Sequence, residues 1–166
     1  VDYRRLNSQL RRFDVGGVDV NACMSQLHGY TLFSSLDLAG SFHQMPLAKA
    51  SRHMTAFNTP FGKYEWCVCA FGLQASPAWI VSVMGATLNG IATPAHTFSS
   101  HTPLTDAMVT YYVDDILIAS KDRQSHLRAL DAVLARLQTN HLYVQPHKCH
   151  FLQPKVTYLG YQLTSS

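Results

Sequence analysis

The sequence predicts an α+β fold in which helices pack on one face of an antiparallel sheet. Short segments rich in β-branched and aromatic residues recur along the chain, and such segments favour strands. Only two segments show the apolar spacing of a helix, and they separate the strand-like segments into groups. The 166 residues are 47% hydrophobic and 14% charged, which is typical of one globular domain with a sizeable core.

The first part of the chain predicts loop and strand. Residues 8–29 contain a Gly-Gly pair and read mostly as loop. Residues 30–38 mix Thr, Phe and Leu before a turn, so we expect a strand there. Residues 55–69 predict a β-hairpin, because Pro60 and Gly62 interrupt two short strand-like runs.

The first helix is predicted over residues 76–90. Ser76 can cap free N–H groups, and proline suits the position that follows it. The apolar positions with helical spacing are Ile80, Val81, Met84 and Leu88. Gly90 ends the pattern, and residues 91–107 show no periodicity, so they predict a surface loop.

The last part of the chain predicts a hairpin, a helix and strands. We expect the hairpin over residues 108–120 and the helix over residues 125–140. The predicted core face of this helix consists of Leu127, Leu130, Leu134 and Leu137. Residues 148–152 and 156–163 read as strands.

Composition excludes several classes of protein. The net charge of +3 and the pI of about 8.7 are compatible with nucleic-acid binding but too weak to imply it. Four cysteines do not suggest a disulfide framework, so reduced thiols and an intracellular setting are expected. No apolar stretch approaches the roughly 20 residues of a membrane span, and no signal peptide is visible. The chain begins at Val1 without Met, so we expect a piece of a longer polypeptide.

Two adjacent carboxylates stand out within residues 108–120. A tight turn between the flanking strands would place Asp114 and Asp115 at the tip of a hairpin. Bare carboxylates beside buried strands are costly, and a hard divalent cation is a natural partner for them. An ordinary polar turn is the alternative, because Asp is common in turns.

A third carboxylate, Asp37, closes a strand of the same apolar character. If this strand lies beside the hairpin, Asp37 and Asp114 converge on one edge. Two or three such carboxylates can hold a pair of Mg²⁺ ions roughly 3.5–4 Å apart for in-line phosphoryl transfer. Spacing alone leaves the question open, since many folds scatter three aspartates.

Other candidate residues have simpler interpretations. Read alone, Phe42 is a core aromatic residue and Arg4 lies on a solvated face. A group of three histidines and one cysteine has the side chains of a zinc site, but its spacing matches no common structural zinc site. The group consists of His141, His147, Cys149 and His150.

Six blocks, taken together and in order, carry a resemblance. They are residues 1–7 (VDYRRLN), 35–44 (SLDLAGSFHQ), 55–57 (TAF), 71–78 (FGLQASPA), 112–118 (YVDDILI) and 158–161 (YLGY). The chain resembles, over essentially its whole length, a reverse transcriptase of the kind encoded by Gypsy-type LTR retrotransposons and retroviruses. The resemblance implies the palm of a right-hand polymerase with partial fingers. It also implies RNA-directed DNA polymerisation, in which dNTPs are added to a primer 3′ end by two-metal phosphoryl transfer.

The resemblance assigns roles by matching position. It implies that Asp37, Asp114 and Asp115 are catalytic and hold two Mg²⁺ ions, with Mn²⁺ as a substitute, and that Asp115 supports the other two. Phe42 matches the aromatic residue that excludes a ribose 2′-hydroxyl. The other residues expected at the nucleotide or the primer terminus are Gly40, Ser41, Phe71, Gly72 and Val113. The residues expected at nucleic acid are Arg4 near the template and Tyr158, Leu159 and Gly160 in the primer grip.

The resemblance also implies partners and a division of the chain. Residues 1–30 and 50–75 would be fingers-like, whereas residues 31–49 and 76–166 would form the palm up to the primer grip. The thumb and the RNase H domain would lie outside this chain. Partners would be an RNA or DNA template, a primer and dNTPs, in a polyprotein with RNase H, integrase and protease. No membrane is expected, and the location would be the cytoplasm, in a virus-like particle.

Two other functions stay open. One is a non-catalytic relic or fragment that keeps residual nucleic-acid binding. The other is an RNA-dependent RNA polymerase, against which Phe42 argues, because an enzyme that makes RNA must admit the 2′-hydroxyl. The sequence departs from the family at His53-Met54, where a basic residue is common, and residues 91–107 form a longer loop than usual.

Overall fold

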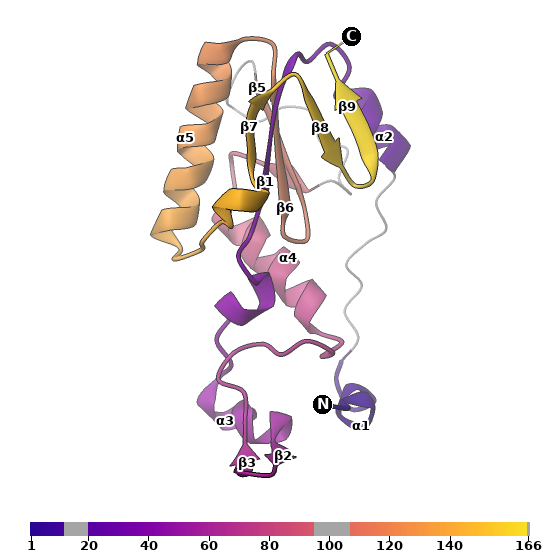
Figure 1. Cartoon of the computed structure of the whole chain (residues 1–166), viewed down its shortest axis with the longest axis vertical. Coiled ribbons are helices and arrows are strands. Elements are labelled where there is room, and N and C mark those ends of the chain that lie inside the picture. Colours follow the sequence, from indigo (N-terminus) through magenta and orange to yellow (C-terminus); the bar gives the residue numbers. More distant parts are fainter. Residues whose placement is uncertain (12–19, 95–106, 166) are drawn as a thin grey trace.

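The structure is a computed structural model, and it describes residues 1–11, 20–94 and 107–165. The molecule is elongated, with a sheet at one end and a small hairpin at the other (Figure 1). Residues 91–107, for which a loop is predicted, lie mainly outside the described residues. In the parts of the chain that are described, no helix is both long and apolar enough to cross a membrane.

A five-stranded sheet forms the upper body of the molecule. Its strand order is β4-β5-β6-β1-β7. All neighbours are antiparallel except the short parallel pair of β4 and β5. The strands span Thr93–Pro94 (β4), Ala107–Tyr112 (β5), Asp115–Ser120 (β6), Leu32–Asp37 (β1) and His150–Gln153 (β7).

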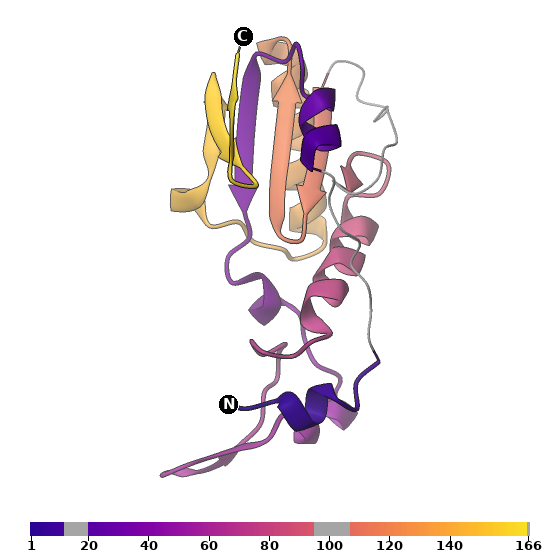
Figure 2. The same ribbon diagram turned by 90° about the vertical axis from the view of Figure 1, so that its right-hand side faces the viewer.

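Both faces of this sheet are covered. Helices α4 (Ser76–Thr87) and α5 (Arg123–Thr139) pack on one face, as predicted, around buried residues such as Ile116 of β6. The other face is covered by α2 (Val20–Gln26) and by the hairpin of β8 (Lys155–Tyr158) and β9 (Tyr161–Thr164). Figure 2 shows these layers from the side. Strand-like residues therefore lie between two apolar layers, which explains their high hydrophobicity.

Short elements make up the lower end. The hairpin pairs β2 (Phe57–Thr59) with β3 (Gly62–Tyr64), so it is shorter than the predicted 55–69. The short helices of this end are α1 (Arg4–Asn7), η1 (Ser41–Gln44), α3 (Lys49–Arg52) and η2 (His53–Thr55). Asn7 joins α1 to the segment that precedes α4: its side chain donates to the Gly72 carbonyl at 2.8 Å and accepts the Gln74 N–H at 2.9 Å.

The predicted core face of α5 is partly wrong. Leu127 is 44% exposed and Leu134 is 37% exposed, although Leu137 is buried as expected. The buried face consists of Ser125, His126, Ala129, Val133 and Leu137. Spacing alone could not choose between these two faces, because polar residues occupy two positions of the buried one.

The polar residues of that face are satisfied by partners from the sheet. Fully buried His126 has Nε2 at 2.6 Å from the Ser34 hydroxyl and Nδ1 at 2.8 Å from the Ser120 hydroxyl. Burial lowers the pKa of His126, because the charged imidazolium would lose water. The Ser34 hydroxyl also accepts the N–H of Leu152 in β7. The hydrogen bonds around His126 therefore connect α5 with β1 and β6 directly and with β7 through Ser34.

Other local differences have simple causes. Residues 156–163 are not one strand but the hairpin of β8 and β9, which turns at Leu159 and Gly160. Both turn residues have positive φ, 50° and 81°, a pattern of two-residue hairpin turns that suits glycine. Ser76 does not cap α4, because its hydroxyl donates to the Ala70 carbonyl and Ala75 is the capping residue.

Candidate active site

The two adjacent carboxylates lie where the sequence predicts them. Strands β5 and β6 pair in the register Tyr112↔Asp115, so Val113 and Asp114 form a two-residue hairpin turn. Val113 has a φ of 55°, which costs a β-branched residue on the order of 1–2 kcal/mol. The buried strands on both sides hold this strained turn in place.

Asp37 meets the pair across the strand interface. Strands β1 and β6 are antiparallel, and their register places Asp37 directly opposite Asp115. Directly opposed residues project from the same face of a sheet. The predicted neighbourhood of Asp37 and the hairpin is therefore confirmed, and the sheet itself produces it.

The electrostatics show that the carboxylates repel one another. Burial, together with the charges of Asp114 and Asp37, raises the pKa of Asp115 to about 6, although Lys148 opposes the shift. An acidic group with a raised pKa marks a place where negative charge is poorly compensated. A cation bound there would offset the repulsion.

Replacing Asp115 with Asn is expected to raise the free energy of unfolding by about 1–2 kcal/mol at pH 7 without divalent cations. The pKa of Asp115 is about 6 in the folded chain and 3.8 ordinarily, so the folded state holds the proton more tightly. Stability is therefore lost as the pH rises from 3.8 to about 6.

Urea unfolding at pH 4, 5, 6 and 7 measures this effect. Asp115→Asn should reduce the fall in the free energy of unfolding between pH 4 and pH 7. Asp131→Asn, a change at an exposed position of α5, should leave this fall as in the wild type. If the variant is no more stable at pH 7 and keeps the wild-type pH dependence, folding does not raise the pKa of Asp115.

Two neighbours of the carboxylates come from the turn after β1. Gly40 has a left-handed φ of 53° and begins η1, in which buried Ser41 donates its hydroxyl to Asp114 Oδ2 at 2.7 Å. The N–H of Ala39, one residue earlier, donates to the Tyr143 carbonyl at 2.9 Å and is therefore not free to bind a phosphate.

Lys148 was missed by sequence analysis. Its Nζ lies 3.6 Å from Asp37 Oδ1, and it is the last residue of the short helix η3 (Pro146–Lys148). The Gln145 N–H donates to the Asp37 carbonyl, and Gln44 bonds to the backbone of Tyr143, so the segment is held against the end of β1. Nothing in the spacing of the sequence indicates this contact.

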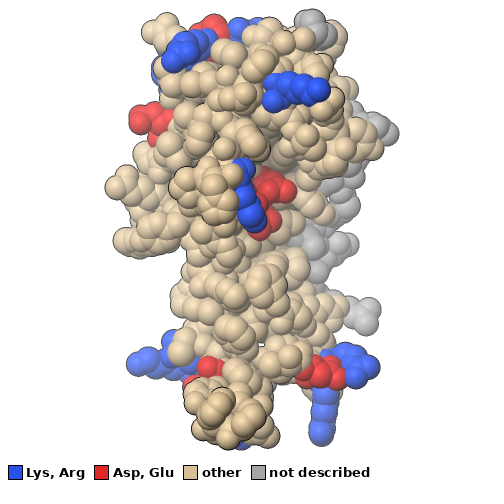
Figure 3. Space-filling view, viewed as in Figure 1, with Lys and Arg blue, Asp and Glu red and all other residues tan. Residues whose placement is uncertain are grey.

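Charge is sparse around this place. In Figure 3, blue and red atoms touch midway along the visible face, within a largely uncharged area. The ion pair of Lys148 and Asp37 is partly exposed, so its energy is modest, on the order of 1 kcal/mol or less. A competing cation could therefore replace the lysine at the carboxylate.

Three further predicted residues, Phe42, Phe71 and Gly72, lie in the segments between β1 and α4. Phe42 follows Ser41, and its ring contacts that of Phe71 edge-on, with centroids 5.5 Å apart. Gly72 has a φ of 89°, and a Cβ there would lie 3.7 Å from the ring of Tyr3. The structure thus brings Phe42 and Phe71 together.

The residues predicted to contact nucleic acid lie in two separate parts of the molecule. Arg4 belongs to α1 at the lower end (Figure 1), where it forms an exposed ion pair of 2.6 Å with Asp2. Tyr158 is buried in front of the β8–β9 turn, and burial raises the pKa of its hydroxyl, with the charge of Asp115 adding to the shift. Tyr158 is thus electrostatically coupled to the carboxylates, whereas Arg4 is remote from them.

The three aspartates supply metal-ligand chemistry but do not enclose a metal site. Within the described residues, no three His, Cys, Asp or Glu side chains converge closely enough to hold a metal ion. The result applies to the histidine–cysteine group and to the three aspartates. For the aspartates, however, the donors are hard oxygen ligands of the kind that Mg²⁺ prefers, and their mutual repulsion favours a cation. The donor chemistry of Asp37, Asp114 and Asp115 therefore fits a divalent metal.

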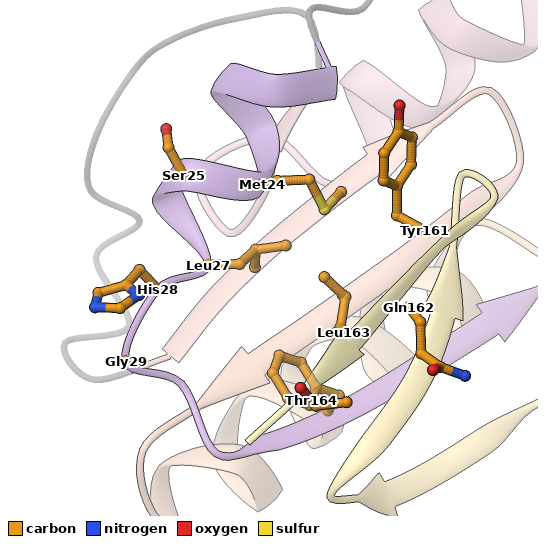
Figure 4. A pocket seen from close by; sticks show the side chains of 10 residues that line it. Met24, Ser25, Leu27, His28, Gly29, Tyr161, Gln162, Leu163 and Thr164 are labelled. Atoms are coloured by element: carbon orange, nitrogen blue, oxygen red, sulfur yellow. The ribbon is translucent and has the colours of Figure 1, made fainter. Parts of the chain in front are cut away.

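A separate pocket has none of this chemistry. Its volume is about 770 Å³, and it lies between α2 and β9, on the side of the sheet opposite to α4 and α5 (Figure 4). Met24 and Leu27 point across it toward β9. None of the three aspartates lines it, so it is not the candidate active site.

Known proteins resemble the whole chain. The family model described as "Reverse transcriptase (RNA-dependent DNA polymerase)" matches residues 1–163. The Transposon Tf2-3 polyprotein of Schizosaccharomyces pombe is 29% identical over 99% of this chain. The Retrovirus-related Pol polyprotein from transposon opus of Drosophila melanogaster is 34% identical over 99% of it. The chain spans only 11% and 15% of the length of these two relatives.

Solved structures share the fold. The foamy viral protease-reverse transcriptase in complex with double-stranded DNA has a TM-score of 0.82 and 24% identity, and covers 99% of this chain. The match spans 26% of the foamy viral chain. The same foamy viral enzyme in complex with an RNA/DNA hybrid has a TM-score of 0.81. The predicted α+β polymerase fold is confirmed by these matches.

Proposed function

The chain belongs to the reverse transcriptase (RNA-dependent DNA polymerase) family, and we propose that it adds deoxynucleotides to the 3′ end of a primer on an RNA template. The observation that carries this proposal is the register that sets Asp37 of β1 opposite Asp115, the residue after Asp114 in the β5–β6 turn. The relatives are polyproteins far longer than this chain. Fusion to protease, RNase H and integrase is therefore part of the proposal.

In this proposal Asp37 and Asp114 hold two Mg²⁺ ions, with Asp115 in support, and Mn²⁺ can replace Mg²⁺. Bound ions of this kind lower the pKa of an attacking hydroxyl and stabilise the leaving pyrophosphate. The chain's own residues prepare the site. Ser41 donates to Asp114 Oδ2, which fixes the orientation of this carboxylate. The ladder between β1 and β6 fixes the backbone of the other two.

Other residues select and orient the substrates. Phe42 excludes nucleotides with a ribose 2′-hydroxyl, and the edge-on contact with Phe71, which holds its ring in place, supports this role. Gly40, Ser41, Phe71, Gly72 and Val113 contact the incoming nucleotide or the primer terminus. The turn formed by Tyr158, Leu159 and Gly160 sets the primer end, and Arg4 lies near the template.

The proposal divides the chain into two functional parts. Residues 31–49 and 76–166 act as the palm, which carries the aspartates on its sheet. Residues 1–30 and 50–75 act as fingers. In support, the lower end consists of short elements that hydrogen bonds join to one another, such as Tyr3 to the Thr55 carbonyl at 3.1 Å.

Primer extension tests the proposed function. The purified protein is incubated with a DNA primer on an RNA template, dNTPs and Mg²⁺, and extended primer is resolved on a gel. We expect stepwise extension that depends on the template and on the divalent ion. A folded protein that binds the duplex but extends no primer under Mg²⁺ or Mn²⁺ would contradict the proposal and favour a non-catalytic relic.

A further inference from the structure

A row of aromatic rings joins the distal hairpin to the candidate active site. It consists of Tyr64, Phe57, Trp66, His43, Phe71 and Phe42. Successive ring centroids lie 6.2, 6.0, 5.4, 4.9 and 5.5 Å apart. The row ends one residue from Ser41, which donates to Asp114. It is therefore continuous from one end of the molecule to the catalytic carboxylates.

The inner rings stabilise the outer ones. From Tyr64 to His43 the interplanar angles are 30°, 35° and 15°, so the first and last pairs are stacked and the middle pair is tilted. Because these rings pack against one another, exposed ring surface remains mainly on Tyr64, which is 50% exposed, and Phe71, which is 60% exposed. Rings that are already held in place lose little side-chain entropy when a ligand stacks on them.

The tip of the hairpin adds one more ring. Phe61 is 89% exposed, in a turn where Thr59 accepts the Phe61 N–H at 3.1 Å and donates its hydroxyl to the Gly62 carbonyl at 3.0 Å. The backbone under this ring is thus fixed. Figure 2 shows that the hairpin projects away from the rest of the molecule, at the end farthest from the sheet. Such an exposed apolar ring has little packing role among the residues that the structure describes.

Charge decides which partner fits this surface. Residues 1–11 and 41–75 carry six basic side chains and only two acidic ones, Asp2 and Glu65. The basic residues are Arg4, Arg5, Arg11, Lys49, Arg52 and Lys63. Figure 3 shows blue side chains at both margins of the lower end, each beside red acidic atoms, with uncharged surface between the two margins. Aromatic rings between cations are typical of single-stranded nucleic-acid sites, where bases stack and phosphates pair with the basic groups.

We propose that Phe61 and Tyr64 are stacking platforms for the unpaired template strand on its way to the active site. The proposal rests on the proposed function, because the row leads to the catalytic carboxylates. A protein partner is the competing interpretation of these exposed rings, because aromatic residues are also enriched at protein interfaces.

Binding of an overhang tests the proposal. The probe is a fluorescent DNA primer annealed to an RNA template, either blunt or with about ten unpaired template nucleotides, a length within the range of single-stranded sites. Its anisotropy is measured against protein concentration without dNTPs. We expect the double variant Phe61→Ala, Tyr64→Ala to bind the overhang probe about tenfold more weakly and the blunt probe as well as the wild type.

Phe151→Ala is the matched control, because Phe151 is also an exposed ring but belongs to β7 of the sheet. It should leave both affinities unchanged, and thermal unfolding should show that all proteins are folded. Unchanged overhang affinity in the double variant would overturn the proposal, as would an equal loss for both probes. A change in sedimentation with no change in overhang binding would identify a protein interface instead.

Primer extension in parallel separates this inference from the proposed function. If the wild type extends primers while the double variant binds overhangs normally, only the template path is wrong. If the wild type extends nothing but needs the rings to bind overhangs, the proposed activity fails and the binding surface stands.

Discussion

Replacing Asp114 with Asn should lower the rate of nucleotide addition by at least about a thousandfold, which corresponds to about 4 kcal/mol of lost transition-state stabilisation. The change removes one negative charge at the hairpin tip, where Asp114 is one of the two main proposed metal ligands. Asn is nearly isosteric, and its amide can still accept the hydrogen bond of Ser41. The loss should therefore appear in chemistry rather than in folding.

Single-turnover primer extension measures this loss, with primer–template binding and thermal unfolding as checks. Asp131→Asn is the matched control, since Asp131 is an exposed aspartate of α5. It removes the same charge away from the site and should keep full activity. If Asp114→Asn extends primers at the wild-type rate, the assignment of the catalytic aspartates is wrong.

Replacing Phe42 with Ala should relax discrimination against ribonucleotides, by about 10–100-fold in the ratio of kcat/KM values for dNTP and NTP. The ring of Phe42 is partly buried and rests against Phe71, so it cannot easily move away from a 2′-hydroxyl. Removing the ring opens that space. The effect should lie in NTP use, because a dNTP does not meet the clash.

Phe42→Tyr tests whether the ring itself is responsible. This variant keeps the aromatic ring and should retain discrimination, whereas Phe42→Ala should lose it. Equal discrimination by both variants would refute the assignment of Phe42. An enzyme that already accepts NTPs in its wild-type form would favour the RNA polymerase alternative.

The parts of the fold that could be predicted are those in which local chemistry and tertiary structure agree. The YVDD turn is one example: apolar runs on both sides must be strands, so the carboxylates between them must lie at a turn. Asp37 is another, because a strand of matching character brings it opposite Asp115. The blocks shared with reverse transcriptases then connect these residues to one activity.

The parts that could not be predicted depend on long-range partners. His126 is fully buried because Ser34 and Ser120 satisfy its ring, and none of this is visible in the spacing of α5. The leucine face was a wrong choice for the same reason, since Leu127 faces outward while His126 faces the sheet. Lys148 reaches Asp37 only because hydrogen bonds hold the 143–148 segment against β1.

The most direct test of the central claim is to count bound Mn²⁺ by electron paramagnetic resonance. The complex contains the protein, a primer–template and a nonhydrolysable dNTP, and wild type is compared with Asp37→Asn and Asp131→Asn. We expect about two tightly bound ions in the wild type and in Asp131→Asn, and fewer in Asp37→Asn. The same number of bound ions in all three proteins would contradict a metal site at Asp37, Asp114 and Asp115.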